Sequence, residues 1–178
     1  MTYRSVLMVF ALLLTAGPTL AGPAAAPPGP ESALPPLQIT HRTGMRVVIQ
    51  VNSGDTIMNG VSKQVFAAKN LYDQYVGLGM KAGKDFDILM VFRADGATFL
   101  LNDSAYDAKV KTPHAPGNPN RRLIDAMQAG GVKMYECGVA MRLKGYAPGD
   151  ILPYSRIVAS GIGAVADFEK DGYLAVTP

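Results

Sequence analysis

The chain of 178 residues contains one cysteine, Cys137, and two histidines. A single cysteine cannot close a loop on itself, so an internal disulfide is excluded. Neither His41 nor His114 has a His, Asp or Glu partner at a spacing typical of a metal site, so no metal site is predicted. Cys137 is therefore an inert buried thiol, a link to another chain, or a reactive sulfur atom.

The sequence also lacks a concentration of positive charge. Its 17 Lys and Arg residues are interspersed with 14 Asp and Glu residues, and the formal net charge is +3. A nucleic-acid groove normally gathers positive charge on one face, so no nucleic-acid partner is predicted. The apolar run over residues 6–16 is shorter than the about 20 residues that span a bilayer, so no membrane span is predicted after signal cleavage.

The first residues have the pattern of a secretory signal peptide. Arg4 precedes the apolar run, Gly17-Pro18 breaks it, and small residues lead to Ala21. This order predicts a signal peptide over residues 1–21 and a periplasmic or secreted protein. An uncleaved apolar anchor is the alternative.

Composition divides the remainder of the chain in two. Six prolines lie between residues 22 and 36, with almost no large apolar side chains. Such a segment cannot bury enough surface to become ordered, so residues 22–40 are predicted to be a Pro/Ala-rich linker. Residues 41–178 have the length of one domain.

Strand and helix patterns alternate along this domain. Strands are predicted at residues 46–52, 86–92, 132–136, 156–160 and 173–176. Helices are predicted from Met58 to Gly77, from Asn118-Pro119 to Gly130, and over residues 138–144 and 161–170. Residues 97–101 are predicted as a short strand or helix entry, and the polar stretch 102–120 as largely a loop. The alternation predicts an α/β fold, in which a mostly parallel sheet of about five strands is flanked by helices in flavodoxin-like layering.

Cys137 is placed where parallel sheets bind ligands, beyond the carboxyl end of a strand. A predicted helix begins at Gly138, and the partial positive charge of a helix start favours a thiolate over a thiol. Arg142 and Lys144 lie one to two turns further on and are candidates for adding positive potential. Glu136 is predicted to point away from the sulfur, because neighbours along a strand face opposite sides.

Other interpretations stay open at this point. Free cysteine is often buried and only fills space. His114, in the polar loop, is a candidate base for Cys137, although no spacing supports such a pair. The Ser53–Thr56 turn follows the first strand, where flavodoxin-like proteins hold phosphate, but a helix cap explains it equally well.

Two segments resemble the DsrE/DsrF-like family: GVKMYECGVAMRLKGY, residues 131–146, and the ending VASGIGAVADFEKDGYLAVTP. The resemblance extends roughly over residues 46–178. Sulfur-relay members carry a cysteine at the end of the corresponding strand, then a short helix that closes in a basic residue and glycine. Cys137 and Lys144-Gly145 are similar to these positions. The resemblance implies a sheet of about five strands, a homo-oligomer (trimer or hexamer), and in some members a cysteine persulfide passed between proteins.

Relay members act in the cytoplasm, whereas this chain has a predicted export signal and resembles the exported branch of the family. We therefore predict an exported sulfur-handling carrier, without a cofactor, that holds a persulfide or mixed disulfide on Cys137. Gly138, Arg142, Lys144 and His114 are the predicted substrate-binding residues, and a sulfur donor or acceptor protein is the predicted partner. A non-catalytic oligomeric binding or assembly module is the alternative, and a flavin or nucleotide binder is less favoured.

Overall fold

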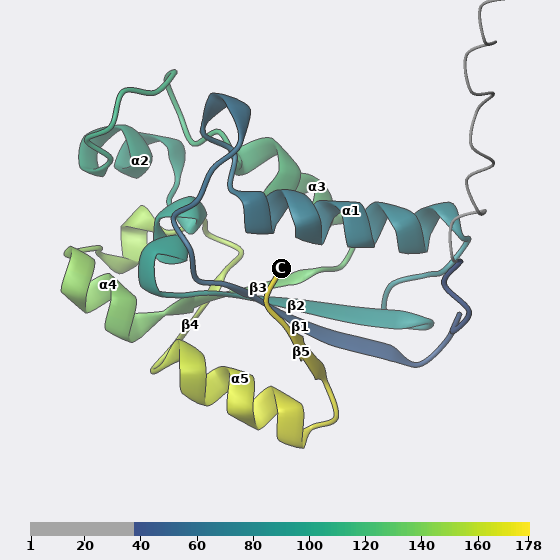
Figure 1. Cartoon of the computed structure of the whole chain (residues 1–178). Helices are drawn as coiled ribbons and strands as arrows, with labels where there is room; N and C mark the ends of the chain where they lie inside the picture. Colours follow the sequence, from purple (N-terminus) through teal and green to yellow (C-terminus); the bar gives the residue numbers. More distant parts are fainter. Residues whose placement is uncertain (1–37) are drawn as a thin grey trace, which may run out of the picture. The chain divides into compact units, whose positions relative to one another are not determined.

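A five-stranded sheet forms the centre of the protein in a computed structural model that describes residues 38–178 (Figure 1). The strands are β1 (Met45–Val51), β2 (Phe86–Phe92), β3 (Lys133–Cys137), β4 (Arg156–Val158) and β5 (Leu174–Val176). Their order is β4-β3-β2-β1-β5, and every neighbouring pair is parallel. The predicted α/β fold is confirmed. The predicted signal peptide and most of the predicted linker lie outside the described residues.

Helices cover both faces of this sheet, with α1 and α3 on one face and α5 on the other (Figure 1). The α-helices are α1 (Lys63–Gly77), α2 (Asp103–Lys109), α3 (Arg121–Ala129), α4 (Gly138–Lys144) and α5 (Gly161–Lys170). Short 3-10 helices are η1 (Met58–Gly60), η2 (Ala94–Leu100) and η3 (Pro148–Asp150). The layers explain why β2 is apolar along nearly its whole length, since a parallel strand in this position is covered on both faces.

The two faces of the sheet belong to separate hydrophobic clusters. Val47 and Ile49 of β1 lie in the larger cluster, whereas Val48, between them, packs with Val165 of α5 in the smaller one. This division follows from the two-residue period of a strand. The same period places successive residues of β3, including Glu136 and Cys137, on opposite faces.

The chain changes faces beside the end of β3. From β1 to β4 each new strand is added next to the previous one, and after β4 the chain passes through α5 to reach β5 on the far side of β1. Ligands in open α/β sheets bind in the crevice at such a switch, outside the carboxyl ends of the strands. Cys137 is the last residue of β3 and lies at this position.

Three local predictions were wrong. Met58 is 84% exposed in η1 rather than buried in α1, because Asn59 and Gly60 have positive φ angles of 62° and 76° that interrupt a helix. The polar stretch contains α2, capped by Asn102, whose side chain accepts from Ala105 N. Helix α3 begins at Arg121, later than the predicted start at Asn118-Pro119.

Candidate functional site

Two helix starts meet at the sulfur of Cys137. The residue ends β3 and directly precedes α4. From the other side, the first backbone N–H of α5, that of Gly161, donates a hydrogen bond to Sγ, with N and Sγ 3.1 Å apart. Helix starts carry partial positive charge, so this arrangement favours negative charge on the sulfur. Cys137 itself is buried, with 5% of its surface exposed.

Gly161 is required for this close approach. A Cβ atom at this position would lie 2.9 Å from Cβ of Arg93 and 3.1 Å from Cβ of Cys137. Any larger residue would force α5 away from the end of β3. The glycine therefore lets the backbone N–H of a helix reach the sulfur directly.

A cavity of about 230 Å³ opens next to the sulfur. It is lined by Arg93, Ala94, Cys137, Val139, Ala140, Leu143, Ser160 and Ile162. Arg93 follows β2 and is tethered by its Nε, which donates to Oε1 of Gln50 at 3.0 Å. Arg93 was not among the predicted site residues, although its place directly after an apolar strand puts it at the same sheet edge as Cys137. The cavity thus combines a cation, a thiol and an apolar wall.

The predicted substrate-binding residues do not all lie in this cavity. Gly138 is the first residue of α4 and is buried against β4, where a Cβ would be 3.0 Å from the carbonyl oxygen of Val158. Arg142 is exposed and does not line the cavity. Lys144 is paired with Asp95, with Nζ and Oδ1 2.9 Å apart.

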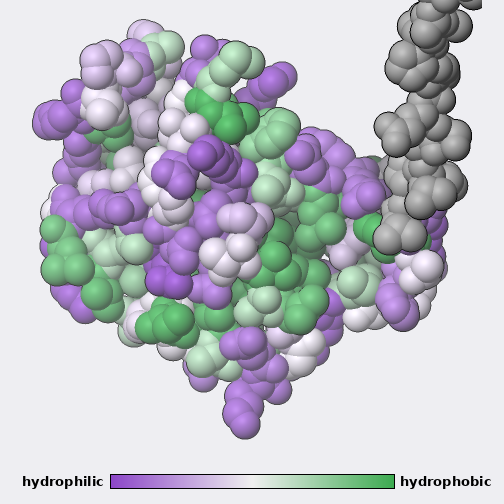
Figure 2. Space-filling view, in the orientation of Figure 1, coloured by the Kyte–Doolittle hydropathy of each residue, from purple (hydrophilic) through white to green (hydrophobic). Residues whose placement is uncertain are grey.

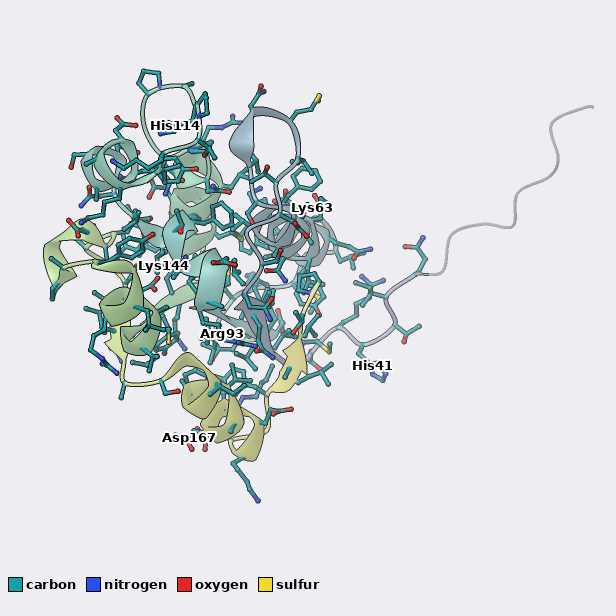
Figure 3. All side chains as sticks on the ribbon, turned by 60° about the vertical axis from the view of Figure 1, so that its left-hand side comes forward. His41, Lys63, Arg93, His114, Lys144 and Asp167 are labelled. Atoms are coloured by element: carbon teal, nitrogen blue, oxygen red, sulfur yellow. The ribbon has the colours of Figure 1, made fainter. Side chains whose placement is uncertain are left out.

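His114 and Lys144 line a second cavity, of about 440 Å³, that does not contain Cys137. The Nδ1 atom of His114 lies 2.7 Å from the carbonyl oxygen of Ala115, and its ring packs on Tyr106. Figure 3 labels Arg93 close to α5, Lys144 beside α4 and His114 on the loop above them. The structure therefore brings His114 and Lys144 together but separates both from the sulfur.

The Ser53–Thr56 turn also contributes to this second cavity, through Gly54 and Thr56. The N–H groups of Asn52 and Ser53 donate to Oε1 of Gln64, at 2.7 and 2.9 Å, and Asp55 N donates to the Ser53 hydroxyl. These bonds already use N–H groups that a phosphate would need. The turn is thus organised by its own hydrogen bonds.

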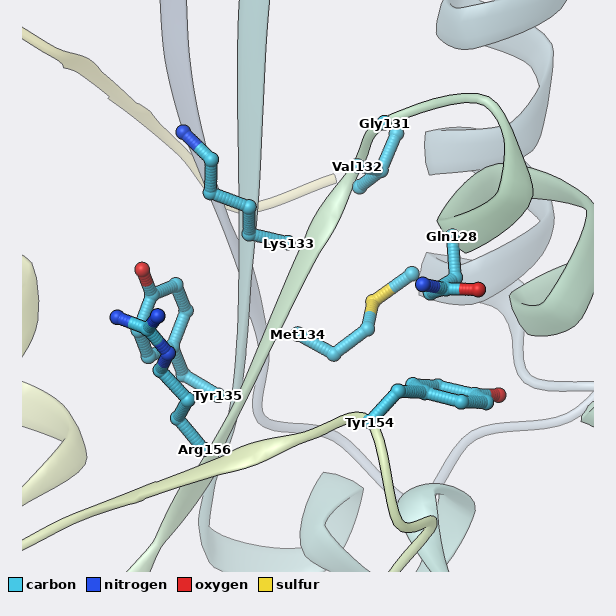
Figure 4. Close-up of a pocket in the computed structure, with 8 residues that line it drawn as sticks. All are labelled: Gln128, Gly131, Val132, Lys133, Met134, Tyr135, Tyr154 and Arg156. Atoms are coloured by element: carbon cyan, nitrogen blue, oxygen red, sulfur yellow. The ribbon is translucent and has the colours of Figure 1, made fainter.

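A third cavity, of about 370 Å³, lies at the opposite end of β3 (Figure 4). Its side chains come from both sides of the strand: Gln128, Gly131, Val132, Lys133, Met134, Tyr135, Tyr154 and Arg156. Because parallel sheets bind their ligands at the carboxyl ends of the strands, we place the candidate site at Cys137.

Glu136, next to Cys137, is completely buried. Within the described part of the chain, neither of its carboxyl oxygens has a hydrogen-bond partner. Burial and, to a smaller degree, the neighbouring Cys137 side chain raise the pKa of this carboxyl to about 9, whereas the backbone N–H of Cys137 and the ammonium of Lys144 act in the opposite direction. The strand pattern predicts that Glu136 faces away from the sulfur, but it does not indicate that this side chain is enclosed in the core.

This buried acid is expected to lower the stability of the protein as the pH rises. Unfolded, the carboxyl titrates near its ordinary pKa of 4.5, whereas the folded protein keeps the proton up to about 9. Between these values the folded state binds more protons than the unfolded state, so the free energy of unfolding falls by on the order of 1 kcal/mol per pH unit. Urea unfolding of the wild type and Glu136→Gln from pH 5 to 8 measures the effect. A decline of the same size in the variant would contradict it.

Residues 38–178 contain no group of three or more His, Cys, Asp or Glu side chains placed to hold a metal ion. No helix among these residues is long and apolar enough to cross a membrane.

Comparison with known proteins gives one family match. The profile of the DsrE/DsrF-like family matches residues 45–178. No curated protein matches the chain significantly.

Two solved structures have a similar fold. A protein of unknown function, MTH1491 from Methanobacterium thermoautotrophicum, is 18% identical with a TM-score of 0.57, and the match covers 75% of this chain and 99% of that one. The ychN protein from E. coli is 14% identical with a TM-score of 0.51, and the covered shares are again 75% and 99%. At these identities, the likeness concerns the fold alone.

Proposed function

Because the chain belongs to the DsrE/DsrF-like family, we propose that it is a sulfur-handling protein that carries a persulfide or mixed disulfide on Cys137. The observation that carries the proposal is the hydrogen bond from Gly161 N to the Cys137 sulfur, 3.1 Å long, at the wall of a cavity that also contains Arg93. A helix N–H and a guanidinium both favour a negatively charged sulfur. Such a sulfur is a nucleophile for sulfur transfer.

The transfer itself requires no net oxidation or reduction. The Cys137 thiolate attacks the outer sulfur of a donor persulfide, R–S–SH, and forms a new S–S bond while the donor's S–S bond breaks. The electron pair of the broken bond leaves on R–S⁻, and Cys137 becomes the persulfide. Attack by an acceptor thiolate on the outer sulfur of Cys137 reverses the process and regenerates the thiolate.

We also propose that the protein acts outside the cytoplasm, as a homo-oligomer, and exchanges sulfur with a donor or acceptor protein. Leu143 and Ile162, at the wall of the cavity, are 83% and 59% exposed, and Ile157 nearby in β4 is 46% exposed. Figure 2 shows hydrophobic surface over α4 and near the start of α5. Exposed apolar groups of this kind support contact with another protein chain. Light scattering of the purified protein tests the self-association.

The test of the sulfur-carrying function is the intact mass of the protein isolated from the periplasm after thiosulfate or sulfide feeding. We expect the wild type to carry the added mass of one or more sulfur atoms, removable by a reducing agent. Cys137→Ala is the control, and because the chain has no other cysteine, its mass should stay unmodified. A wild-type protein that acquires no sulfur under any of these conditions would refute the proposal.

The burial of Cys137 favours a second candidate, a non-catalytic binding or assembly module. The residue packs with Ala97 and Ala140 in a small apolar cluster, as a space-filling side chain would. In that case Cys137→Ala would retain both the assembly and the biological activity of the wild type. The flavin or nucleotide hypothesis has less support, because N–H groups of the Ser53–Thr56 turn are already bonded within the protein.

A further inference from the structure

Glu136 is a buried acid to which the sulfur chemistry assigns no role. It lies in the register of the sheet between Phe92 of β2 and Ile157 of β4, and no part of it is exposed. Phe92 and Met134, which share its face of the sheet, belong to the larger hydrophobic cluster. The side chain of Glu136 is therefore buried on the same face of the sheet as the larger hydrophobic cluster, next in sequence to Cys137.

The surroundings favour the neutral form of this carboxyl. An ionised carboxylate needs hydrogen bonds or a paired cation when it is removed from water. Both oxygens of Glu136 lack a hydrogen-bond partner among the described residues. The titratable groups that act on it are Cys137 of β3 and Lys144 of α4, and the ammonium of Lys144 is paired with Asp95 at 2.9 Å. The backbone N–H of Cys137 also favours the anion, although it makes no hydrogen bond of normal geometry to the carboxyl, and burial outweighs both of these groups.

The charge of Glu136 and the charge of the sulfur oppose each other. The two residues are neighbours on β3, and in a poorly solvated interior a negative charge on one disfavours a negative charge on the other, even though their side chains leave opposite faces of the sheet. The effect is reciprocal, since a charged sulfur makes the acid harder to ionise and an ionised acid makes the thiolate harder to form. The helix start at Gly161, whose N–H donates to the sulfur, favours a negative charge on the sulfur over one on the buried carboxyl.

We propose that Glu136 is a positioning residue for Cys137. While its carboxyl is neutral, it does not oppose a negative charge on the neighbouring sulfur. When the carboxyl ionises, it opposes that charge. The proposal deepens the proposed function, because it concerns the same sulfur. Glu136 neither donates nor accepts a proton in the transfer step; the negative charge passes from Cys137 to the leaving thiolate. Neutralising the sulfur by capping it should therefore make Glu136 easier to ionise.

The first experiment observes the carboxyl directly in the wild-type protein. The ¹³C shifts of labelled Glu side chains are followed from pH 4 to 11, before and after Cys137 is capped with iodoacetamide, which leaves an uncharged thioether. We expect the Glu136 midpoint to lie near 9 in the free protein and to fall after capping. A midpoint near the ordinary pKa of 4.5, or the same midpoint in both forms, would overturn the proposal.

The second experiment measures the rate of alkylation of Cys137 against pH. Glu136→Gln should react at the wild-type rate near pH 7, where the carboxyl of Glu136 is still protonated, and roughly threefold or more faster than the wild type above pH 9, where it ionises. Glu169→Gln makes the same chemical change at an exposed position of α5 and should follow the wild type throughout. Equal profiles for Glu136→Gln and the wild type would contradict the proposal.

These outcomes are independent of whether the protein carries sulfur in the cell. Capping and alkylation report on the pair of side chains, whereas the intact mass of the isolated protein reports on sulfur loading. If loading fails while the midpoint shifts, the carrier function is wrong and the coupling stands. If Glu136→Gln does not fold, the carboxyl titration of the wild type decides the question alone.

Discussion

Replacing Gly161 with alanine is expected to slow the alkylation of Cys137 by about tenfold, because a hydrogen bond to a charged group is worth ~1.5 kcal/mol. The added Cβ would lie 2.9 Å from Cβ of Arg93 and 3.1 Å from Cβ of Cys137. Helix α5 must then move away from β3, and its first N–H can no longer reach the sulfur. Overpacking of this kind also costs ~1–3 kcal/mol of stability. The rate with iodoacetamide near neutral pH and urea unfolding measure the two effects.

Gly163, two residues further along α5, provides the matched control. A Cβ at this position would meet Ser160 at 3.6 Å, an ordinary contact, and the residue lies inside the helix. Gly163→Ala should keep the wild-type alkylation rate and stabilise the protein by ~0.5–1 kcal/mol, since alanine is the better helix former. Equal slowing in both variants would show that the Gly161 hydrogen bond is not what activates the sulfur.

The largest loss of stability is expected for Gly96→Ala. A Cβ at Gly96 would lie 2.2 Å from the carbonyl oxygen of Val51 and 2.9 Å from the backbone N of Asn52. Both are main-chain atoms at the end of a central strand, so the clash cannot be relieved by a side-chain rotation. We expect a loss of more than ~3 kcal/mol, the upper end of overpacking costs, measured by urea unfolding.

Gly149→Ala is the control for this variant, because a Cβ there would have no neighbour within 4 Å. Its stability should stay within ~0.5 kcal/mol of the wild type, as for most surface substitutions. A Gly96→Ala protein of wild-type stability would mean that η2 does not pack against the end of β1 as described. Gly96 also lies between two residues near the site. Asp95 pairs with Lys144, and Ala97 packs with Cys137 and Ala140 in the small apolar cluster.

Elements with a strong hydrophobic pattern were predictable from the sequence. The apolar run of β2 and the helices α4 and α5 have the predicted bounds. Elements that depend on backbone conformation or on distant partners were not. The start of α1 is set by Asn59 and Gly60, which have left-handed backbone conformations. The hydrophobic pattern of a sequence does not indicate a positive φ angle.

Buried polar side chains were also not predictable from the sequence. Asn118 lies in a polar stretch that reads as a surface loop, yet its Nδ2 donates to the carbonyl oxygens of Phe99 and Leu101 inside the protein. Asn120 accepts from Ser62 N through its Oδ1 and thereby connects the start of α1 with the start of α3. Such bonds join segments far apart in the sequence, so local composition does not reveal them.

The candidate site was predictable in part. The place of Cys137 at a strand end before a helix followed from local pattern alone. The hydrogen bond from Gly161 could not be predicted from local pattern. It forms only because β4 pairs with β3 and the chain then crosses to the other face of the sheet. The burial of Glu136 depends equally on β3 having a neighbour on each side.

The burial of Cys137 affects how long a group bound to its sulfur persists, in addition to how the sulfur reacts. With 5% of its surface exposed, and with the cavity beside it lined by Leu143 and Ile162, an adduct on its sulfur would meet bulk thiols and oxidants rarely. The lifetime of such an adduct would then depend on how often a fitting reactant enters the cavity, and less on the redox composition of the surrounding fluid. Storage and release of the bound group would both be governed by encounter at that opening.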